Sequence, residues 1–417
     1  MTQQLEEQPN HLDIMVVGAG MVGSTLALSL ADSGLAIGLM DAGPLEVKPF
    51  DPQAPFAARV SALSPASRLI FERLGVWDGI IGRRACGYRA MRVWDGLGSG
   101  EIYFDSKGQA TEFLGHIVEN RVVQDAVIER LQGTAVQLLG GSRLVALQRR
   151  DGLWQLDLDD GRQYFTSLLI GADGAQSSVK RLTNTPSREW DYLHHAIVTT
   201  VHCAEPHQNT AWQRFTEYGP LAFLPLPEPG GRACSIVWSQ LPERAAELAK
   251  LLDEPFCQAL GRAFEERLGP ITAADPRVLI PLRQRHARRY VDEGLAFVGD
   301  AAHVIHPLAG QGVNLGLLDV AVLSEVLLHA YSRQESISSV HTLSRFERRR
   351  MPHNLAMMGA MEGLERLFHA DALPMRWLRN AGLGWVDRLP QVKGFFMRQA
   401  FGLGELPARW RQLLHSA

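Results

Sequence analysis

The sequence predicts an α/β protein with two interleaved domains and a helical C-terminal region, on the basis of three observations. A short apolar strand that ends in glycine occurs near the start, at 14–17, a β-rich stretch covers 196–239, and a second buried-strand pattern returns at 295–298. The return implies that one domain is interrupted by another. We expect a discontinuous first domain at 1–185 and 275–335. An inserted β-sheet domain is expected at 186–274, with part of 86–105, and a helical region at 336–417.

The N-terminal segment has the pattern of a β-α-β unit. The apolar run 14–17 predicts a buried strand, 21–33 predicts a helix that Gly34 ends, and 36–40 predicts a second strand that leads to Asp41. The glycine fingerprint GAGMVG lies between the first strand and the helix. This is the context in which such a fingerprint binds a dinucleotide.

Each glycine of the fingerprint has its own use in such a site. Gly18 permits the tight turn, Gly20 lets a pyrophosphate approach the backbone, and Gly23 lets the helix pack close to the strand. The helix N-terminus supplies N–H groups and partial positive charge for phosphates, and Asp41 stands where an acid binds the adenosine ribose. The unit predicts a Rossmann-like dinucleotide site, and the alternative is a glycine-rich packing turn.

The next stretch mixes helices and strands and ends in a second motif. Helical patterns cover 65–74 and 122–131, and strand patterns from 136 to 165 suggest a small antiparallel sheet. The buried run 168–170 leads into the motif GADG, whose Asp173 can accept hydrogen bonds. Taken alone, an Asp-Gly pair after a strand is a turn.

The middle of the chain changes to β-rich segments, which we assign to the inserted domain. The expected strands are 196–203, 211–217, 221–226 and 234–239. A helical stretch over 242–268 follows them and ends at Gly269.

The third motif follows the buried run 295–298 and reads GDAAH at 299–303, then PLAGQGVN at 307–314. Asp300 can accept a hydrogen bond from a ribityl hydroxyl, and the alternative is a helix N-cap. N–H groups where the loop meets the helix can face the flavin N1 and C2 carbonyl, where negative charge develops on reduction. Three motifs in this order indicate one pocket assembled from remote segments, which suits FAD.

Composition excludes several other classes. The chain has 417 residues, a formal net charge of −3, and 46% hydrophobic and 21% charged residues, so an ordinary globular protein without a nucleic-acid partner is predicted. The four cysteines fit no metal spacing, so we expect buried, reduced thiols, no metal site and a cytoplasmic location. The N-terminus lacks the basic start of a secretory signal, and the uncharged run 14–31 is interpreted as a strand and helix rather than a membrane span.

Two basic runs need an interpretation. We expect 283–289 and 345–350 to form solvated faces or helix ends. The alternative is attraction to an acidic lipid surface or to a cofactor phosphate.

Taken together, these motifs resemble the class A flavoprotein monooxygenases of the para-hydroxybenzoate hydroxylase type, from about Asp13 to about Arg350. Finer features are similar to the ubiquinone-biosynthesis hydroxylase branch, and within it to the VisC-type polyprenylphenol hydroxylases. They are RVSAL at 59–63, HIVEN at 116–120, WDY at 190–192 and HVIHPLAGQGVNLG at 303–316.

The resemblance implies a flavin-dependent hydroxylation. FAD is bound non-covalently, NAD(P)H reduces it without a second nucleotide fold, and O₂ then gives a C4a-hydroperoxide that transfers one oxygen to an electron-rich ring. By family position, Arg59 and Arg121 approach the flavin, and Asp173 and Asp300 hold it. The resemblance also implies that the flavin loop lines the pyrimidine side of the ring, through Gly310, Gln311, Gly312, Val313 and Asn314. Further residues near the flavin loop are His303, His306 and Pro307, of which the two histidines are expected to be structural. The sequence assigns no substrate-activating residue.

One position departs from the family pattern. The second motif usually places an arginine where this chain has Lys180, with Arg181 next to it. Lysine keeps the charge and loses the planar fork, so a specific guanidinium contact at this position is in doubt.

The expected substrate is a polyprenylated phenol or quinol, whose apolar tail implies a peripheral membrane contact on the inner face. The basic and apolar composition of 373–414 allows this contact, and a core helix explains the composition equally well. A homo-oligomer or a biosynthetic complex is also allowed. Two alternatives stay open: an FAD-dependent dehydrogenase or prenyl reductase on the same fold, and a non-catalytic FAD-binding subunit of an assembly.

Overall fold

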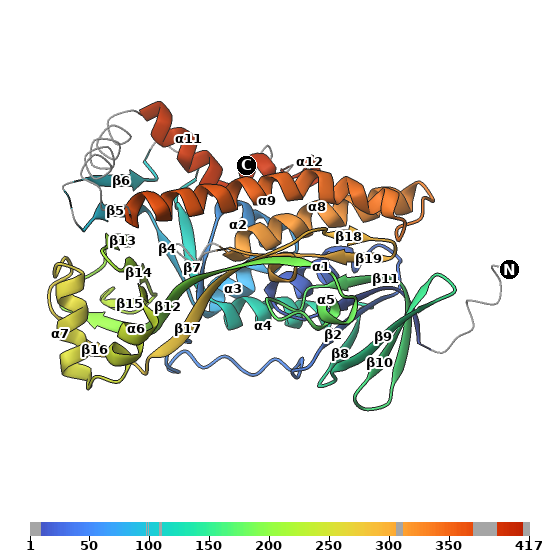
Figure 1. Cartoon of the computed structure of the whole chain (residues 1–417), viewed down its shortest axis with the longest axis horizontal. Helices are drawn as coiled ribbons and strands as arrows, with labels where there is room; N and C mark the ends of the chain where they lie inside the picture. The colour runs from blue at the N-terminus through green and yellow to red at the C-terminus, as the bar shows by residue number, and fades with distance from the viewer. Residues whose placement is uncertain are drawn as a thin grey trace.

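The computed structural model describes residues 10–96, 98, 100–107, 111–305, 312–369 and 390–411. It confirms the α/β class: two large sheets lie side by side, one at each end of the molecule, with long helices across them (Figure 1). The four cysteines are all buried and none forms a disulfide, as expected.

The first sheet has eight strands and combines parallel and antiparallel pairs. Its order is β18-β19-β11-β1-β2-β8, and β10 and β9 extend from β11 as an antiparallel ribbon. The central strand β1 is almost entirely buried and pairs in parallel with β2 and β11, as its apolar run requires. The bounds are β1 His11–Val17, β2 Ile37–Asp41, β8 Gln137–Gly140, β9 Leu144–Arg150, β10 Leu153–Leu158, β11 Gln163–Gly171, β18 Val291–Asp292 and β19 Leu295–Phe297.

The second sheet has nine strands and includes two from early in the chain. Its order is β20-β17-β12-β15-β14-β13-β5-β6, with β16 on β12, and β5 pairs in parallel with β13. The bounds are β5 Ala90–Asp95, β6 Glu101–Asp105, β12 Ser187–Cys203, β13 Thr210–Thr216, β14 Gly219–Pro225, β15 Ala233–Gln240, β16 Ile271–Ala274, β17 Val278–Ala287 and β20 His303–Val304. The helices α6 (Pro242–Ala249) and α7 (Asp253–Ala263) pack on this sheet.

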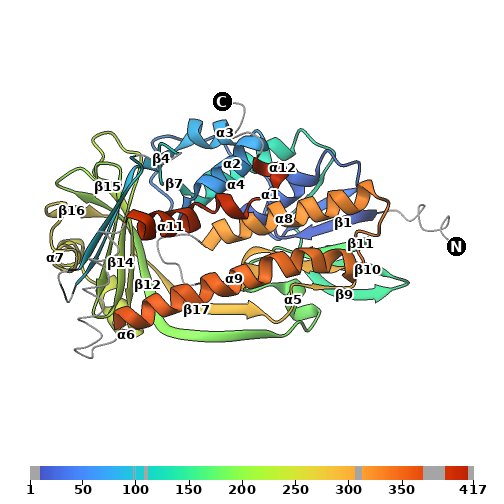
Figure 2. The same ribbon diagram turned by 90° about the horizontal axis from the view of Figure 1, so that it is seen from above.

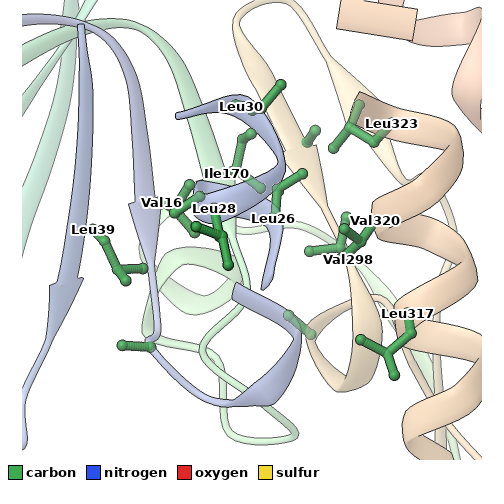
Figure 3. Close-up of a cluster of buried hydrophobic side chains, with 14 of the residues drawn as sticks. Val16, Leu26, Leu28, Leu30, Leu39, Ile170, Val298, Leu317, Val320 and Leu323 are labelled. Atoms are coloured by element: carbon green, nitrogen blue, oxygen red, sulfur yellow. The ribbon is translucent and has the colours of Figure 1, made fainter. Parts of the chain in front are cut away.

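A small third sheet and the remaining helices complete the first half of the molecule. The sheet has the order β3-β7-β4, with bounds β3 Val60–Leu63, β4 Ala85–Tyr88 and β7 Gly115–Glu119. The helices here are α1 Met21–Leu30, α2 Pro65–Arg73, α3 Trp77–Arg83, α4 Asn120–Leu131 and α5 Ser178–Leu182. Figure 3 shows that α1 is packed between the strands of the first sheet and α8 (Gly312–Ser332), with Leu26 between Ile170 and Val320 in the core.

The C-terminal region packs against both sheets. Helix α9 (Val340–His369) lies beside α8 and extends from the first sheet toward the second (Figure 2). Helix α11 (Pro390–Phe401) buries Met397 and Phe401. A turn η3 (Leu403–Glu405) and the short α12 (Ala408–Arg411) then bring Trp410 onto α8, where its indole N–H donates to the Ala321 carbonyl at 3.0 Å. In this described part of the tail, Met397, Phe401 and Trp410 belong to the core, as the core-helix interpretation expects, and the basic side chains are exposed.

Helix α8 is long and apolar enough to cross a membrane by length and composition. However, 78% of its apolar window is buried inside the protein, which is typical of a core helix. The uncharged run 14–31, weighed above as such a segment, forms β1 and α1 instead.

Several expected elements differ from the structure. The strand at 136–139 does not join an antiparallel sheet; as β8, it extends the parallel sheet beside β2. The stretch 242–268 is two helices, α6 and α7, rather than one. The basic run 283–289 falls largely on β17, where Arg283 is exposed and pairs with Asp191. In the run 345–350, Arg350 is 1% exposed, so a solvated face is wrong for that residue.

Candidate functional site

The glycine fingerprint forms the turn between β1 and α1. Gly18 has a φ of +103°, and a Cβ there would lie 2.5 Å from the Ala172 carbonyl oxygen, so the turn and the approach of β11 both require glycine. A Cβ on Gly23 would lie 1.9 Å from the Gly18 carbonyl oxygen, because α1 packs against the turn. A Cβ on Gly20 would meet nothing within 4 Å. Gly20 therefore faces open space, which is the arrangement that lets a ligand approach the backbone.

A cavity of about 640 Å³ lies beside this turn, and its walls come from four stretches of the chain, within 17–20, 40–42, 142–144 and 172–181. Asp41 borders it, with Oδ2 accepting from the Ala19 N–H at 2.7 Å and Oδ1 from the Gly43 N–H at 2.8 Å. Those bonds fix the carboxylate at the cavity wall. The remaining lining residues are Val17, Gly18, Gly20, Met40, Ala42, Ser142, Arg143, Leu144, Ala172, Asp173, Gly174, Gln176, Ser178 and Arg181. Sequence reasoning missed the contribution of β8–β9, whose short linking turn carries Arg143.

Asp173 lines the same cavity, yet its carboxylate is already engaged by the protein. Oδ2 accepts from the N–H groups of Ser178 and Val179 at 2.6 and 3.1 Å, and Oδ1 from the Ser177 hydroxyl. These contacts cap the first turn of α5. Asp173 thus orders the loop around the cavity, in addition to any contact with a ligand.

Lys180, the departure from the family pattern, joins the second and third motifs. Its Nζ donates to the Ala301 carbonyl at 3.2 Å. Burial lowers the pKa of Lys180, and the neighbouring Arg285 lowers it further. A single carbonyl acceptor suits an ammonium group and needs no guanidinium fork.

Asp300 lies in the turn η1 (Gly299–Ala301), directly after β19. Its side chain is exposed, while the surrounding protein atoms desolvate it and raise its pKa; His303 and Arg59 act in the opposite direction. Arg59 immediately precedes β3, so the third motif and the segment 59–63 are electrostatically coupled.

Asn314 is positioned as expected at the start of α8, but its side chain is committed to the protein. Its Oδ1 accepts from the Ser64 N–H at 3.0 Å and the Ser67 hydroxyl at 2.7 Å, and its Nδ2 donates to the Ala62 carbonyl at 2.8 Å. The side chain therefore clamps α8 to the β3–α2 turn. Gly312 and Val313 also belong to the first turn of α8, whose N–H groups have no acceptor within the helix.

The predicted residues His306, Pro307, Gly310 and Gln311 lie outside the described residues.

Helix α4 carries Arg121, which was expected to approach the flavin, and a second polar side chain that contacts the fingerprint. Arg121, in its first turn, is 61% exposed and pairs with Asp125 at 3.4 Å. Gln124, which sequence reasoning missed, donates from Nε2 to the Ala19 carbonyl at 2.7 Å. The spacing of three residues placed Gln124 on the same helix face as Arg121 and was the available signal.

A buried polar cluster lies behind the Asp300 turn. His303 Nε2 is 2.6 Å from Asp319 Oδ2, and Arg350 Nε is 2.8 Å from Asp319 Oδ1, with all three side chains at most 1% exposed. His303 is thus held inside the protein, which agrees with a structural role. Asp319 was missed, although a lone aspartate on the buried stripe of an apolar helix is a usable signal.

These residues fit a dinucleotide. One end of the assembly offers an open backbone turn, a helix N-terminus and a fixed carboxylate, as an adenosine diphosphate group requires. The other end offers the Asp300 turn, Arg59 and the first turn of α8.

Comparisons with known proteins agree with this geometry. Residues 11–359 match the family described as FAD binding domain. The chain is 37% identical over 392 residues to the 3-demethoxyubiquinol 3-hydroxylase of Escherichia coli (strain K12), covering 94% of this chain and 98% of that protein. It is 37% identical over 406 residues to the ubiquinone hydroxylase UbiL of Rhodospirillum rubrum, covering 95% and 92%.

The fold also has solved counterparts. The p-nitrophenol 4-monooxygenase PnpA from Pseudomonas putida DLL-E4 superposes with a TM-score of 0.75 at 18% identity, over 94% of this chain and 98% of that one. At that identity the likeness shows the fold alone. From the family match and the two relatives, this chain belongs to the FAD-binding domain family and, within it, to the flavin-dependent hydroxylases of ubiquinone biosynthesis.

Proposed function

We propose that this protein hydroxylates the aromatic ring of a polyprenylated phenol or quinol, using FAD, NAD(P)H and O₂. The observation that carries the proposal is the convergence of four stretches of the chain on one cavity beside the glycine fingerprint, in a chain 37% identical to a 3-demethoxyubiquinol 3-hydroxylase over 94% of its length. Bound FAD supplies the redox chemistry, taking electrons from NAD(P)H and delivering one atom of O₂ to the ring.

The cavity beside the fingerprint takes the adenosine diphosphate half of FAD. The Asp41 carboxylate is fixed at the wall by Ala19 and Gly43, so it accepts hydrogen bonds from the ribose hydroxyls. The first turn of α1 directs N–H groups at the phosphates. Arg143 and Arg181 line the same cavity and add positive charge.

The opposite end takes the flavin. Asp300 accepts from a ribityl hydroxyl, and Arg59 lies close enough to stabilise its charge. The first turn of α8 stabilises negative charge on the reduced ring by about 0.3–2 kcal/mol, the usual worth of a helix end. Asn314 holds that turn in place through the Ser64 and Ala62 backbone.

A substrate with a long apolar tail comes from a membrane, so we also propose a peripheral contact at the membrane surface. In the described part of the tail the apolar Met397 and Phe401 are buried, whereas Arg398, Arg409 and Arg411 are exposed. The contact is then electrostatic, worth about 1 kcal/mol per basic residue on an anionic surface. Co-sedimentation with anionic and with zwitterionic vesicles tests it, and an R398Q/R409Q/R411Q variant that binds anionic vesicles like the parent contradicts it.

The reaction is tested with the FAD-loaded protein, a short-tailed polyprenylphenol and ¹⁸O₂. We expect NAD(P)H oxidation that depends on the phenol, and one labelled oxygen in the product. Oxidation without label in the product would instead support a dehydrogenase or prenyl reductase. A flavin that neither NADH nor NADPH bleaches, with or without phenol, would support a non-catalytic subunit. Deletion in the native host, with quinone intermediates followed by mass spectrometry, then identifies the substrate by the phenol that accumulates.

A further inference from the structure

Asp319 is a buried carboxylate in the middle of an apolar helix. It is fully buried in α8, and its carboxylate accepts four hydrogen bonds. Oδ1 accepts from Arg350 Nε at 2.8 Å and Asn354 Nδ2 at 3.2 Å, both on α9. Oδ2 accepts from the Gly299 N–H at 3.1 Å and from His303 Nε2 at 2.6 Å.

The two groups on Oδ2 mark the ends of a five-residue segment, 299–303, that we call the seam. The chain leaves the first sheet at β19 just before Gly299, and it enters the second sheet at β20, where His303 pairs with His286. Asp300 lies between these ends, in the turn of the seam. One carboxylate oxygen therefore holds both ends of the turn that presents Asp300.

The groups bonded to the two oxygens of Asp319 keep its carboxylate ionised. Burial raises the pKa of Asp319, but His303 and Arg350 more than offset this and lower the pKa to about 2. Arg350 also bonds the Asn354 Oδ1 at 2.7 Å and the Leu315 carbonyl at 3.4 Å, so it ties α9 to the first turns of α8. A buried ion pair adds little stability compared with an apolar replacement of the same volume. Stability alone is thus a weak reason for this one.

We propose that Asp319 is a positioning residue for the cofactor: it fixes the seam against the N-terminal part of α8, so that Asp300 and the first turn of α8 meet the flavin half of FAD in register. The inference rests on the proposed assignment of the fingerprint cavity to the adenosine half and of the Asp300 turn to the flavin half. Asp319 touches neither half, and it acts through Gly299 and His303.

The experiment compares two probes on the apoprotein, FAD and ADP. ADP contains only the part that the fingerprint cavity takes, so it reports the folded state of that cavity without the seam. In a D319N/R350M variant, which removes both buried charges together, we expect FAD to bind about tenfold more weakly or worse, the usual effect of losing an orienting group behind a ligand contact. ADP affinity should stay within about twofold of the parent. The visible spectrum of FAD bound to this variant should also shift, since the flavin environment changes.

Two further variants keep the inference open to refutation. H303L leaves the Asp319–Arg350 pair intact and releases one end of the seam. If the double variant does not fold, the FAD and ADP affinities of H303L test the proposal in its place. R214M removes a less buried pair, Arg214 of the second sheet with Glu265 at 2.9 Å, and should leave the binding of both probes unchanged.

Equal loss of FAD and ADP affinity in the double variant and in H303L would overturn the positioning role and leave a structural one. Unchanged FAD affinity and spectrum in both would overturn it as well. If the parent apoprotein binds FAD but not ADP, the assignment of the two cavity halves fails, and the inference falls with it.

Discussion

Replacing Asn314 tests whether the clamp between α8 and the β3–α2 turn is as important as its geometry indicates. The N314A variant leaves the Ser64 N–H and the Ala62 carbonyl without their partner, in a position where the side chain is only 8% exposed. Each buried, unpaired backbone group costs about 1–3 kcal/mol. The Ser67 hydroxyl, in contrast, can turn to Ser64 Oγ at 3.3 Å. Since water relieves part of the loss, we expect a destabilisation of about 3 kcal/mol.

The N314D variant gives the sharper result because it changes one atom. The carboxylate still accepts from Ser64 and Ser67, but when ionised it opposes the Ala62 carbonyl, which costs about 1–3 kcal/mol. The favourable position in the first turn of α8 offsets only about 0.3–1 kcal/mol. The pKa of the introduced carboxyl is therefore raised above its unfolded value of about 3.9. The free energy of unfolding of N314D, relative to that of the parent, is then highest at low pH. It falls as the pH rises through the pKa that the carboxyl has in the folded state.

The assay is thermal unfolding of the apoproteins from pH 5 to pH 8, together with FAD titration. S61A is the control, because it removes a single side-chain bond, from Ser61 to Asn120 Oδ1 at 2.7 Å, in the neighbouring strand. We expect the control to lose about 1 kcal/mol without a pH trend. The reasoning is refuted if N314A unfolds within about 0.5 kcal/mol of the parent, or if N314D gains stability as the pH rises.

Three further predictions concern other parts of the fold. Burial lowers the pKa of His116 from 6.5 to about 4, so the unfolded state takes up the proton first as the pH falls. The free energy of unfolding should therefore fall by up to about 3 kcal/mol between pH 6.5 and pH 4. In H116Q, the melting temperature should depend less steeply on pH over this range. The Cβ of G23A would lie 1.9 Å from a carbonyl oxygen, whereas that of G20A has no neighbour within 4 Å. G23A should therefore yield little folded protein and G20A folded protein with a low FAD-to-protein ratio, and equal yields would contradict this. W410F removes the bond to Ala321, and its melting temperature should drop by an amount equivalent to about 1 kcal/mol.

The sequence predicted those parts of the site whose function is local. Gly18 and Gly23 are needed by a turn and a helix within a few residues of them, so the fingerprint pattern identified them correctly. Asp41 follows from its place at the end of the second strand, and it does border the cavity. The class of fold followed from the same signals, because each buried strand of the first sheet has a continuous apolar run.

Other features depend on partners that are distant in the sequence. Asn314 was expected to line the flavin, but its side chain meets Ser64, which is 250 positions away. Arg350 belongs to a basic run, and only the packing of α9 on α8 reveals that it is buried against Asp319. Strand β17 escaped notice because polar Gln284 and His286 occupy two of its buried positions beside Leu282, so its alternation carries only a weak hydrophobic signal.

The seam between the two sheets has a consequence for the order in which the protein can be made. Strand β1 is synthesised long before β19, which belongs to the same sheet and ends at Phe297, and the Asp300 turn then leads into the second sheet through β20. Its anchor Asp319 and the counter-charge Arg350 follow later still. A nascent chain therefore cannot complete the flavin end of the site until translation has passed Arg350. Expression yield should then depend on the supply of FAD at the end of synthesis, and a fragment that stops before α9 should not retain the cofactor.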